Sequence, residues 1–246
     1  MSILEDSNYT RQLDIIRPNE IPPVTLIGCG AAGSGVGIIL AKMGAQFLKL
    51  WDGDRVEEHN IPNQYYGNDA LGKYKVEALM DEMLRYTPRE MNPTIETHME
   101  HYTGEPVTTE YVFVLVDSLE ARRDIFTSLR NNHNVKWLID ARMGAEIYQL
   151  YTVNMENGLE KREYWESLQV EPLEAPCTAR SIIYNVMSMA GLAVAMFKGL
   201  VREQSVPRTI GINLNSFTPS WIVYRDSGEP TMVIAPRRKK RPRRRS

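Results

Sequence analysis

Short apolar runs alternate with amphipathic segments along the first half of the chain. Apolar runs with the length of strands lie at 24–28, 46–51, 111–117 and 135–141, and a more polar run that could form a strand lies at 94–98. Apolar residues recur at helical spacing in the segments 32–43, 73–86 and 118–132. Strands that alternate with helices in this way predict a parallel sheet with helices on both faces.

The pattern changes in the second half. Residues 144–155 alternate between apolar and polar positions and lead to Asn157-Gly158, which favours antiparallel strands and a turn at one edge of the sheet. Residues 156–176 are charged and predict a loop, whereas 181–201 are apolar and predict a long buried helix. Short strands are expected at 209–215, 221–225 and 231–235. We therefore expect an α/β, Rossmann-like fold: a mostly parallel sheet with helices on both faces and antiparallel edge strands, in one domain over 1–235.

Composition adds limits on where the protein works. Hydrophobic residues make up 43% of the 246 residues and charged residues 24%, as is usual for globular proteins. No apolar run approaches the ~20 residues that span a bilayer, and the first ten residues lack the basic and apolar blocks of a secretory signal. The two cysteines, Cys29 and Cys177, are too few for a disulfide framework or a four-cysteine zinc site. A cytoplasmic protein without a membrane partner is expected.

The net charge of −2 hides a strong asymmetry. Eight Lys or Arg residues lie within the last ten positions, and without them 21 basic and 31 acidic residues leave a body of about −10. Such a run predicts a disordered tail over 236–246. Residues 237–245 could bind nucleic acid without sequence specificity, or the tail could serve solubility or dock on the acidic body.

A glycine turn follows the first apolar run. Gly28, Gly30 and Gly33 lie where a strand passes into a helix, which allows a tight turn and close approach of a phosphate to the helix N-terminus. Asp52 ends the next apolar run, where its carboxylate can accept hydrogen bonds from ribose hydroxyls. This pattern predicts a nucleotide site.

Further polar residues narrow the class of nucleotide enzyme. Asp54 adds a second carboxylate, the loop after it carries Asn60, Asn63 and Gln64, and Lys73 and Lys75 lie where the next helix begins. Asp117 ends the fourth strand, so it is expected at the same sheet edge, where a carboxylate facing polyphosphate suits Mg²⁺. An NAD-dependent oxidoreductase would need the glycine turn and one acid, which leaves Lys75, Gln64 and Asp117 unexplained.

The order of these motifs resembles the ThiF/MoeB/HesA family, whose adenylation domain is shared with the ubiquitin-activating enzymes. The resemblance covers residues 9 to about 142 and rests on GxGxxG, DxD, N-I-P-N-Q, G-K-x-K and V-D-S-L-E-A-R-R. It implies an eight-stranded sheet, a dimer, and ATP with Mg²⁺ as cofactors. The implied reaction is attack of the C-terminal carboxylate of a ubiquitin-like or sulfur-carrier protein, ending in Gly, on the ATP α-phosphate.

The resemblance also assigns roles to individual residues. It implies nucleotide contacts from the glycine turn, the two acids of the DxD motif, and the polar loop residues and lysine: Gly28, Gly30, Gly33, Asp52, Asp54, Asn60, Gln64 and Lys75. Asp117 matches the metal-binding aspartate and Arg122 the arginine five residues later. Tyr9-Thr10-Arg11-Gln12 matches a Y-x-R-Q segment whose arginine reaches the nucleotide of the partner subunit, so Arg11 is a candidate trans arginine.

Two departures and two cysteines leave alternatives open. Asn63 replaces an arginine of the family, a loss that another residue such as Arg142 could cover, and the CxxC zinc pairs are absent. Cys177 is either an acyl or persulfide carrier activated by a helix N-terminus and Arg180, or a partly buried cysteine without a catalytic role. Cys29 is expected to be packed and inert, and none of the four histidines is interpreted as a metal ligand. A non-catalytic nucleotide-binding scaffold, with the basic tail holding nucleic acid, is the alternative function.

Overall fold

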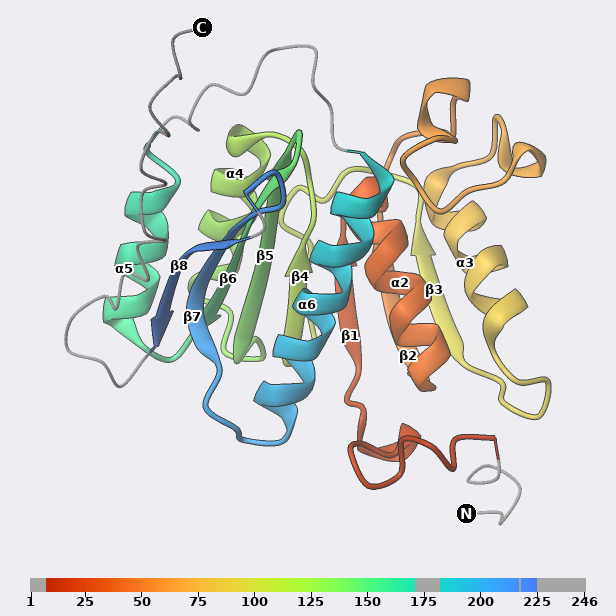
Figure 1. Ribbon diagram of the computed structural model, residues 1–246, viewed down its shortest axis with the longest axis horizontal. Helices are drawn as coiled ribbons and strands as arrows, with labels where there is room; N and C mark the ends of the chain where they lie inside the picture. Colours follow the sequence, from red (N-terminus) through yellow and green to blue (C-terminus); the bar gives the residue numbers. More distant parts are fainter. Residues whose placement is uncertain (1–7, 171–181, 217, 225–246) are drawn as a thin grey trace, which may run out of the picture.

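The computed structural model describes residues 8–170, 182–216 and 218–224. Within these residues eight strands form one sheet (Figure 1). The strands are β1 (Val24–Ile27), β2 (Phe47–Trp51), β3 (Thr94–His98), β4 (Tyr111–Val114), β5 (Trp137–Gly144), β6 (Ile147–Asn154), β7 (Pro207–Asn213) and β8 (Thr218–Tyr224). Their order across the sheet is β3-β2-β1-β4-β5-β6-β7-β8.

The sheet is parallel on one side and antiparallel on the other. From β3 to β5 all neighbours are parallel, with Val24 of β1 beside Leu48 of β2 and Tyr111 of β4. Strands β6, β7 and β8 continue the sheet with antiparallel pairing. The expected Rossmann-like fold with antiparallel edge strands is therefore confirmed.

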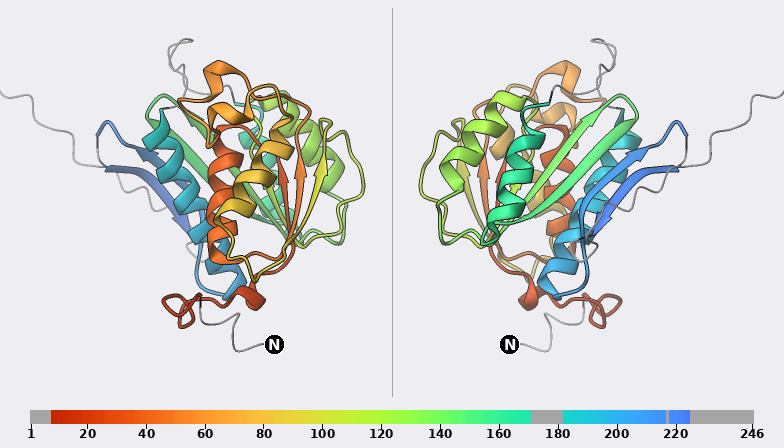
Figure 2. Two further views of the ribbon diagram at one scale, coloured as in Figure 1. Left: turned by 90° about the vertical axis from the view of Figure 1, so that its right-hand side faces the viewer. Right: turned by 90° about the vertical axis from the view of Figure 1, so that its left-hand side faces the viewer.

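Helices cover both faces of the sheet. Figure 2 shows helices on both sides of the sheet, and they pack on two different apolar cores. The first layer contains α2 (Ala31–Met43), α3 (Lys75–Tyr86) and α6 (Ile183–Val201), and the second contains α4 (Leu119–Leu129) and α5 (Gly158–Ser167). The buried apolar side chains of the strands divide between two cores, so that Leu26 belongs to the core under α2 and α6 and Ile27 to the core under α4 and α5.

Helix α6 is the predicted long apolar helix. It packs on α2 so closely that a Cβ at Gly35 would lie 2.9 Å from the Cβ of Ala190. Its length and composition would suffice to cross a membrane, so the expectation that no apolar run approaches that length was wrong. In the fold, however, 56% of its apolar window is buried against the protein core.

The charged segment after β6 forms a helix rather than a loop. The predicted turn at Asn157-Gly158 is instead the start of α5, because the Asn157 side chain accepts hydrogen bonds from the backbone N–H groups of Leu159 and Glu160. The actual reversal lies between β5 and β6, where Ala145 has a positive φ of 51°. An Asn-Gly pair can form a hairpin turn or the start of a helix. The helix forms here because it buries Tyr164 and Leu168 in the second core.

Two strand boundaries also differ from the prediction. Strand β4 ends at Val114, so Asp117 lies in the following loop rather than in the strand, and β5 continues to Gly144. The expected strand 231–235, Cys177 and the basic tail 236–246 lie outside the described residues.

Candidate functional site

The glycine turn lies where the chain reverses its direction of travel across the sheet. From β1 the chain proceeds to β2 and β3 on one side, then crosses to β4 and β5 on the other. Loops after β1 and β4 therefore diverge at the carboxyl ends of two adjacent parallel strands. In open α/β sheets such a switch point forms the binding crevice.

Two glycines of the turn are required by packing. Gly28 has φ +99°, and a Cβ there would lie 2.8 Å from the carbonyl carbon and oxygen of Leu115, just after β4. A Cβ at Gly33 would lie 2.0 Å from the carbonyl oxygen of Gly28, so only glycine lets α2 start against the turn. Gly30 differs, because a Cβ there meets nothing within 4 Å and no side chain caps the N-terminus of α2. The turn is thus packed on the sheet side and open on the helix side.

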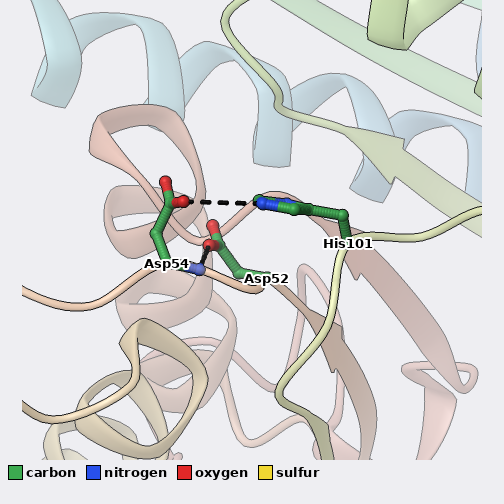
Figure 3. A group of neighbouring side chains, drawn as sticks. All are labelled: Asp52, Asp54 and His101. Atoms are coloured by element: carbon green, nitrogen blue, oxygen red, sulfur yellow. Dashed lines mark hydrogen bonds and ion pairs between the residues drawn. The ribbon is translucent and has the colours of Figure 1, made fainter.

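Asp52 is fixed by the turn itself. Its Oδ2 accepts a hydrogen bond from the backbone N–H of Cys29 at 2.7 Å, and its Oδ1 accepts one from the N–H of Asp54 at 2.9 Å (Figure 3). Burial raises the pKa of Asp52, while these two hydrogen bonds and Lys75 oppose the rise. Each carboxylate oxygen keeps a lone pair, so Asp52 can still accept hydrogen bonds from a ligand.

Lys75 is brought to the same place by the second acid. As the first residue of α3 it is buried, and its Nζ lies 2.7 Å from Oδ2 of Asp54. On the other side of Asp54, the Nε2 of His101 lies 3.6 Å from Oδ1 (Figure 3). His101 also lies against Gly53, where a Cβ would be 3.1 Å from its ring. Sequence reasoning passed over His101, although its position after β3, beside β2 in the sheet, placed it at this edge.

The loop between the DxD motif and α3 is closed on itself. Arg55 pairs with Tyr74 in an isolated antiparallel bridge, and the backbone N–H of Val56 donates to the carbonyl of Lys73 at 2.9 Å. The guanidinium of Arg55 also lies over the Tyr74 ring, 3.8 Å from its centroid. Residues 56–73 therefore leave and rejoin the fold at one point.

Polar side chains of this closed loop have different roles. Asn60 is buried, and its Oδ1 accepts a hydrogen bond from the N–H of Glu57 at 2.9 Å, which supports the loop. Gln64 has a buried Oε1 without a hydrogen-bond partner among the described residues. Tyr66, which sequence reasoning missed, donates to the carbonyl of Cys29 and lies 3.2 Å from that of Lys75, so it ties the loop to the turn.

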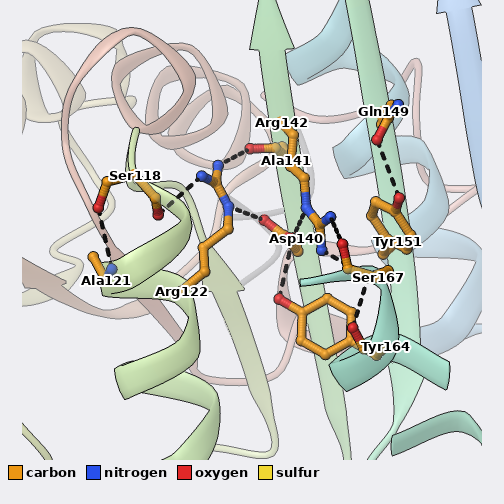
Figure 4. A network of polar contacts seen from close by, with 10 residues as sticks. All are labelled: Ser118, Ala121, Arg122, Asp140, Ala141, Arg142, Gln149, Tyr151, Tyr164 and Ser167. Atoms are coloured by element: carbon orange, nitrogen blue, oxygen red, sulfur yellow. Dashed lines mark hydrogen bonds and ion pairs between the residues drawn. The ribbon is translucent and has the colours of Figure 1, made fainter. Parts of the chain in front are cut away.

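The fold places Asp117 and the two later arginines, Arg122 and Arg142, in different surroundings. Asp117 is exposed in the loop after β4. Arg122 is buried, with its Nε 2.8 Å from Oδ1 of Asp140 in β5. Arg142 places its Nε 2.6 Å from the other Asp140 oxygen and its Nη2 3.1 Å from the hydroxyl of Ser167 in α5 (Figure 4). Because Arg142 is engaged there, the geometry does not support it as a substitute for the cation missing at Asn63.

The N-terminal motif lies far from the turn of the same chain. The Nε2 of Gln12 donates to the carbonyl of Met43 at 2.8 Å, and Tyr9 packs where a Cβ at Gly44 would be 3.0 Å from its ring. This segment therefore contacts the C-terminal end of α2, whose 13 residues span about 20 Å. Arg11 is exposed, and the N-terminal segment that carries it lies at the amino ends of the parallel strands (Figure 1).

Comparison with known proteins places the chain in a family. The ThiF family model matches residues 22–218, most of the chain. The chain belongs to the ThiF family. The resemblance inferred from the motif order is thereby confirmed, and with it membership of a family of ATP-dependent adenylyltransferases that act on ubiquitin-like or carrier C-termini.

Curated relatives of this ThiF-family chain include ubiquitin-like modifier-activating enzyme 5 from two invertebrates. The Drosophila mojavensis protein is 26% identical over 162 residues, 55% of this chain and 39% of the relative. The Caenorhabditis briggsae protein is 26% identical over 161 residues, 63% of this chain and 35% of the relative. The chain thus matches at most about two fifths of the length of these relatives.

Solved structures share the ThiF fold with this chain. PaaA superimposes with a TM-score of 0.72 at 19% identity, covering 92% of this chain and 75% of PaaA. E. coli MccB, in a crystal structure with ATP, gives 0.59 at 17% identity and covers 89% and 68%. E. coli tRNA N6-threonylcarbamoyladenosine dehydratase, TcdA, gives 0.58 at 18% identity and covers 75% and 87%.

Proposed function

We propose that this protein adenylates the C-terminal carboxylate of a small ubiquitin-like or sulfur-carrier protein ending in Gly, using ATP and Mg²⁺. One observation carries the proposal. The Asp52 carboxylate is locked by the N–H groups of Cys29 and Asp54 beside an uncapped helix N-terminus at the switch point of the sheet. The same hydrogen bonds thus join the carboxylate that would bind the ribose to the glycine turn that would bind the phosphates.

The residues present fit ATP. Gly30 leaves open space before α2, where backbone N–H groups and the helix dipole favour phosphate. Asp52 would accept hydrogen bonds from the ribose hydroxyls, and Lys75 would shift from Asp54 toward the phosphates. The buried Oε1 of Gln64, which lacks a partner in the described chain, would gain a donor from the nucleotide or a bound water.

The donor set also fits Mg²⁺. Asp117 offers an exposed carboxylate two residues after Leu115, the residue that contacts Gly28. Mg²⁺ is commonly held by one or two carboxylates together with phosphate oxygens, which suits this position. When bound, the ion would neutralise negative charge on the triphosphate.

The proposed reaction follows from this arrangement. An oxygen of the carrier carboxylate attacks the α-phosphorus, the bond from that phosphorus to the bridging oxygen breaks, and pyrophosphate leaves with the electron pair. Asp52 and the glycine turn orient the nucleotide, and Lys75 stabilises charge on the phosphates. Cys177, which lies outside the described residues, would receive the acyl group only after this step.

A second copy of the chain would complete the site. Arg11 lies near the C-terminal end of α2, about 20 Å from the glycine turn of its own chain, so it can serve a nucleotide only in a partner. A two-fold dimer would supply two such arginines. Mixing inactive Arg11→Ala with inactive Asp117→Ala subunits should restore part of the activity, and mixed dimers without any activity would argue against trans action.

Pyrophosphate exchange with ATP and a carrier peptide tests the function. Asp117→Ala should lose exchange by about 100-fold or more while retaining nucleotide binding, whereas Asp52→Ala should lose nucleotide affinity. Asp81→Ala is a matched control. Asp81 is an exposed acid on α3, and it pairs with Lys73, which precedes that helix. Exchange in Asp117→Ala equal to that of the parent would refute the assignment.

A nucleotide-binding scaffold is the second candidate. It is favoured by Asn63 in place of an arginine and by Arg142, whose guanidinium is engaged by Asp140 and Ser167. Nucleotide binding without exchange would support it. Duplex binding at low and moderate salt, compared between the full chain and a chain ending at Ala235, would then test whether residues 237–245 hold nucleic acid.

A further inference from the structure

The loop that carries Asp117 is anchored on its β1 side. The N–H of Leu115 donates to the carbonyl of Ile27 at 2.8 Å. The carbonyl of Leu115 also lies against Gly28 so closely that no side chain fits between them. The start of this loop is therefore fixed to the glycine turn.

A buried arginine anchors the other end of the loop. Ser118, the residue after Asp117, caps α4, and its carbonyl lies 3.3 Å from Nη1 of Arg122. The same guanidinium places Nη2 2.8 Å from the carbonyl of Ala141 and Nε 2.8 Å from Oδ1 of Asp140 (Figure 4). Arg122 thus bridges the loop to β5, and Asp117 lies between two fixed points.

Asp140 is itself held in place from the α5 side. It is fully buried, and its Oδ2 lies 2.6 Å from Nε of Arg142 and 3.1 Å from the hydroxyl of Tyr164. Burial alone would raise the pKa of Asp140, but the charges of Arg122 and Arg142 outweigh it and hold the pKa below its usual value. The carboxylate stays ionised and cannot turn away from Arg122.

Such a network is not explained by stability alone. The buried guanidinium of Arg122 and the partly buried one of Arg142 share one carboxylate, and apolar side chains of similar volume often stabilise a core as well or better. The network is centred midway along β5, where Asp140 lies in register with Val114, the last residue of β4 before the loop that carries Asp117. Its contacts lead from α5 through Asp140 and Arg122 to Ser118.

We propose that Arg122 and Asp140 are positioning residues for Asp117. They fix the backbone on the α4 side of this carboxylate, opposite the end that Leu115 holds against Ile27 and Gly28, so that Asp117 meets a metal–nucleotide complex without first having to order its loop. Neither residue touches the nucleotide. The proposal rests on the proposed function, because it assumes that Asp117 faces the metal.

Mg²⁺-dependent nucleotide binding provides the test, measured by calorimetry with a non-hydrolysable ATP analogue. Arg122→Lys keeps the charge but cannot bridge Asp140, Ala141 and Ser118 together. We expect unchanged analogue affinity without Mg²⁺ and a half-saturating Mg²⁺ concentration raised about tenfold. Tyr164→Phe is the matched control, because it loosens Asp140 on the α5 side and leaves Arg122 in place, and its Mg²⁺ dependence should stay within about twofold of the parent.

Three outcomes separate this proposal from the proposed function. A folded Arg122→Lys protein with the Mg²⁺ dependence of the parent overturns the positioning role. If Arg122→Lys does not fold, Asp140→Asn takes its place, since it can keep an oxygen facing Arg122 while it removes the charge and the second acceptor oxygen, and a folded Asp140→Asn protein with the Mg²⁺ dependence of the parent overturns the role in the same way. If Asp117→Ala binds Mg²⁺ and analogue like the parent, the metal assignment of the proposed function fails, and the positioning role fails with it.

Discussion

Asp52 and Asp140 are two buried aspartates at the same edge of the sheet, held in opposite ways. Asp52 accepts hydrogen bonds only from backbone N–H groups, and burial raises its pKa. Asp140 contacts two guanidiniums and a hydroxyl, and the arginine charges lower its pKa despite complete burial. The same side chain is thus costly to ionise at one place and firmly ionised at the other.

The difference separates a binding group from a framework group. Asp52 keeps unused acceptor capacity beside the uncapped N-terminus of α2, which a ligand can take up. Asp140 has its oxygens committed to three side chains, so that it transmits position and has little left to offer a ligand. Charge and burial alone would not distinguish the two residues, whereas the identity of their donors does.

The largest effect is expected at Asp140. Asp140→Ala leaves Arg122 and Arg142 buried without their anion and should lower the free energy of unfolding by about 3–5 kcal/mol. Asp52→Asn should lower it by about 1–2 kcal/mol, because only backbone hydrogen bonds are disturbed. Urea unfolding measures both, and equal losses would remove the distinction between the two aspartates.

The glycine turn offers a sharper comparison between two positions three residues apart. Gly33→Ala places a Cβ 2.0 Å from a carbonyl oxygen and should cost about 3 kcal/mol or more of stability. Gly30→Ala meets no atom within 4 Å, so stability should hold while nucleotide affinity falls. Thermal unfolding and nucleotide titration of both variants check this, and a stable Gly33→Ala protein would contradict the geometry of the turn.

Acid should affect the two aspartates with opposite sign. The pKa of Asp140 is lowered by folding, so its contribution to stability is present above about pH 4 and is lost as the pH falls further. Asp140→Asn should therefore show a shallower loss of stability between about pH 5 and pH 3 than the parent. The pKa of Asp52 is raised by folding, so its contribution is lost as the pH rises. Asp52→Asn should steepen the acid loss slightly, as urea midpoints across this range would reveal.

The smallest effect concerns Cys29 in the turn. Burial first, and then the charge of Asp52, raise the pKa of this thiol well above its usual value. In a Cys177→Ser background, Cys29 should react with a thiol reagent only as fast as the protein opens. Fast modification of the native protein would mean that the turn opens far more often than its packing implies.

Most of the fold could be predicted because its central strands are recognisable in the sequence as short apolar runs. Strands β1 and β4 are buried at every position and, apart from Thr25, apolar, because helices cover both of their faces. Helix α5 could not be predicted, because few of its side chains are buried and Asn157-Gly158 serves a turn or a helix cap equally well. Its burial depends on α4 and β6, which the local sequence does not display.

The candidate site divides in the same way. The glycine turn, Asp52 and Lys75 follow from the order of motifs along one β-α-β-α stretch. His101, Tyr66 and Asp140 do not, because each meets its partners across strands or loops that are remote in sequence. Asp140 in particular looks like a single polar residue within an apolar strand until Arg122 and Arg142 are placed around it.

The bridge between Arg55 and Tyr74 has a consequence for how this protein can diverge. Because the chain rejoins the fold where it left, residues 56–73 could gain or lose length without moving Asp54 or Lys75. Doubling the length of such a loop costs only about 0.6 kcal/mol in closure entropy. The parts of this loop away from Asn60, Gln64 and Tyr66 could therefore change, or accept a grafted peptide, while the proposed nucleotide site keeps its geometry.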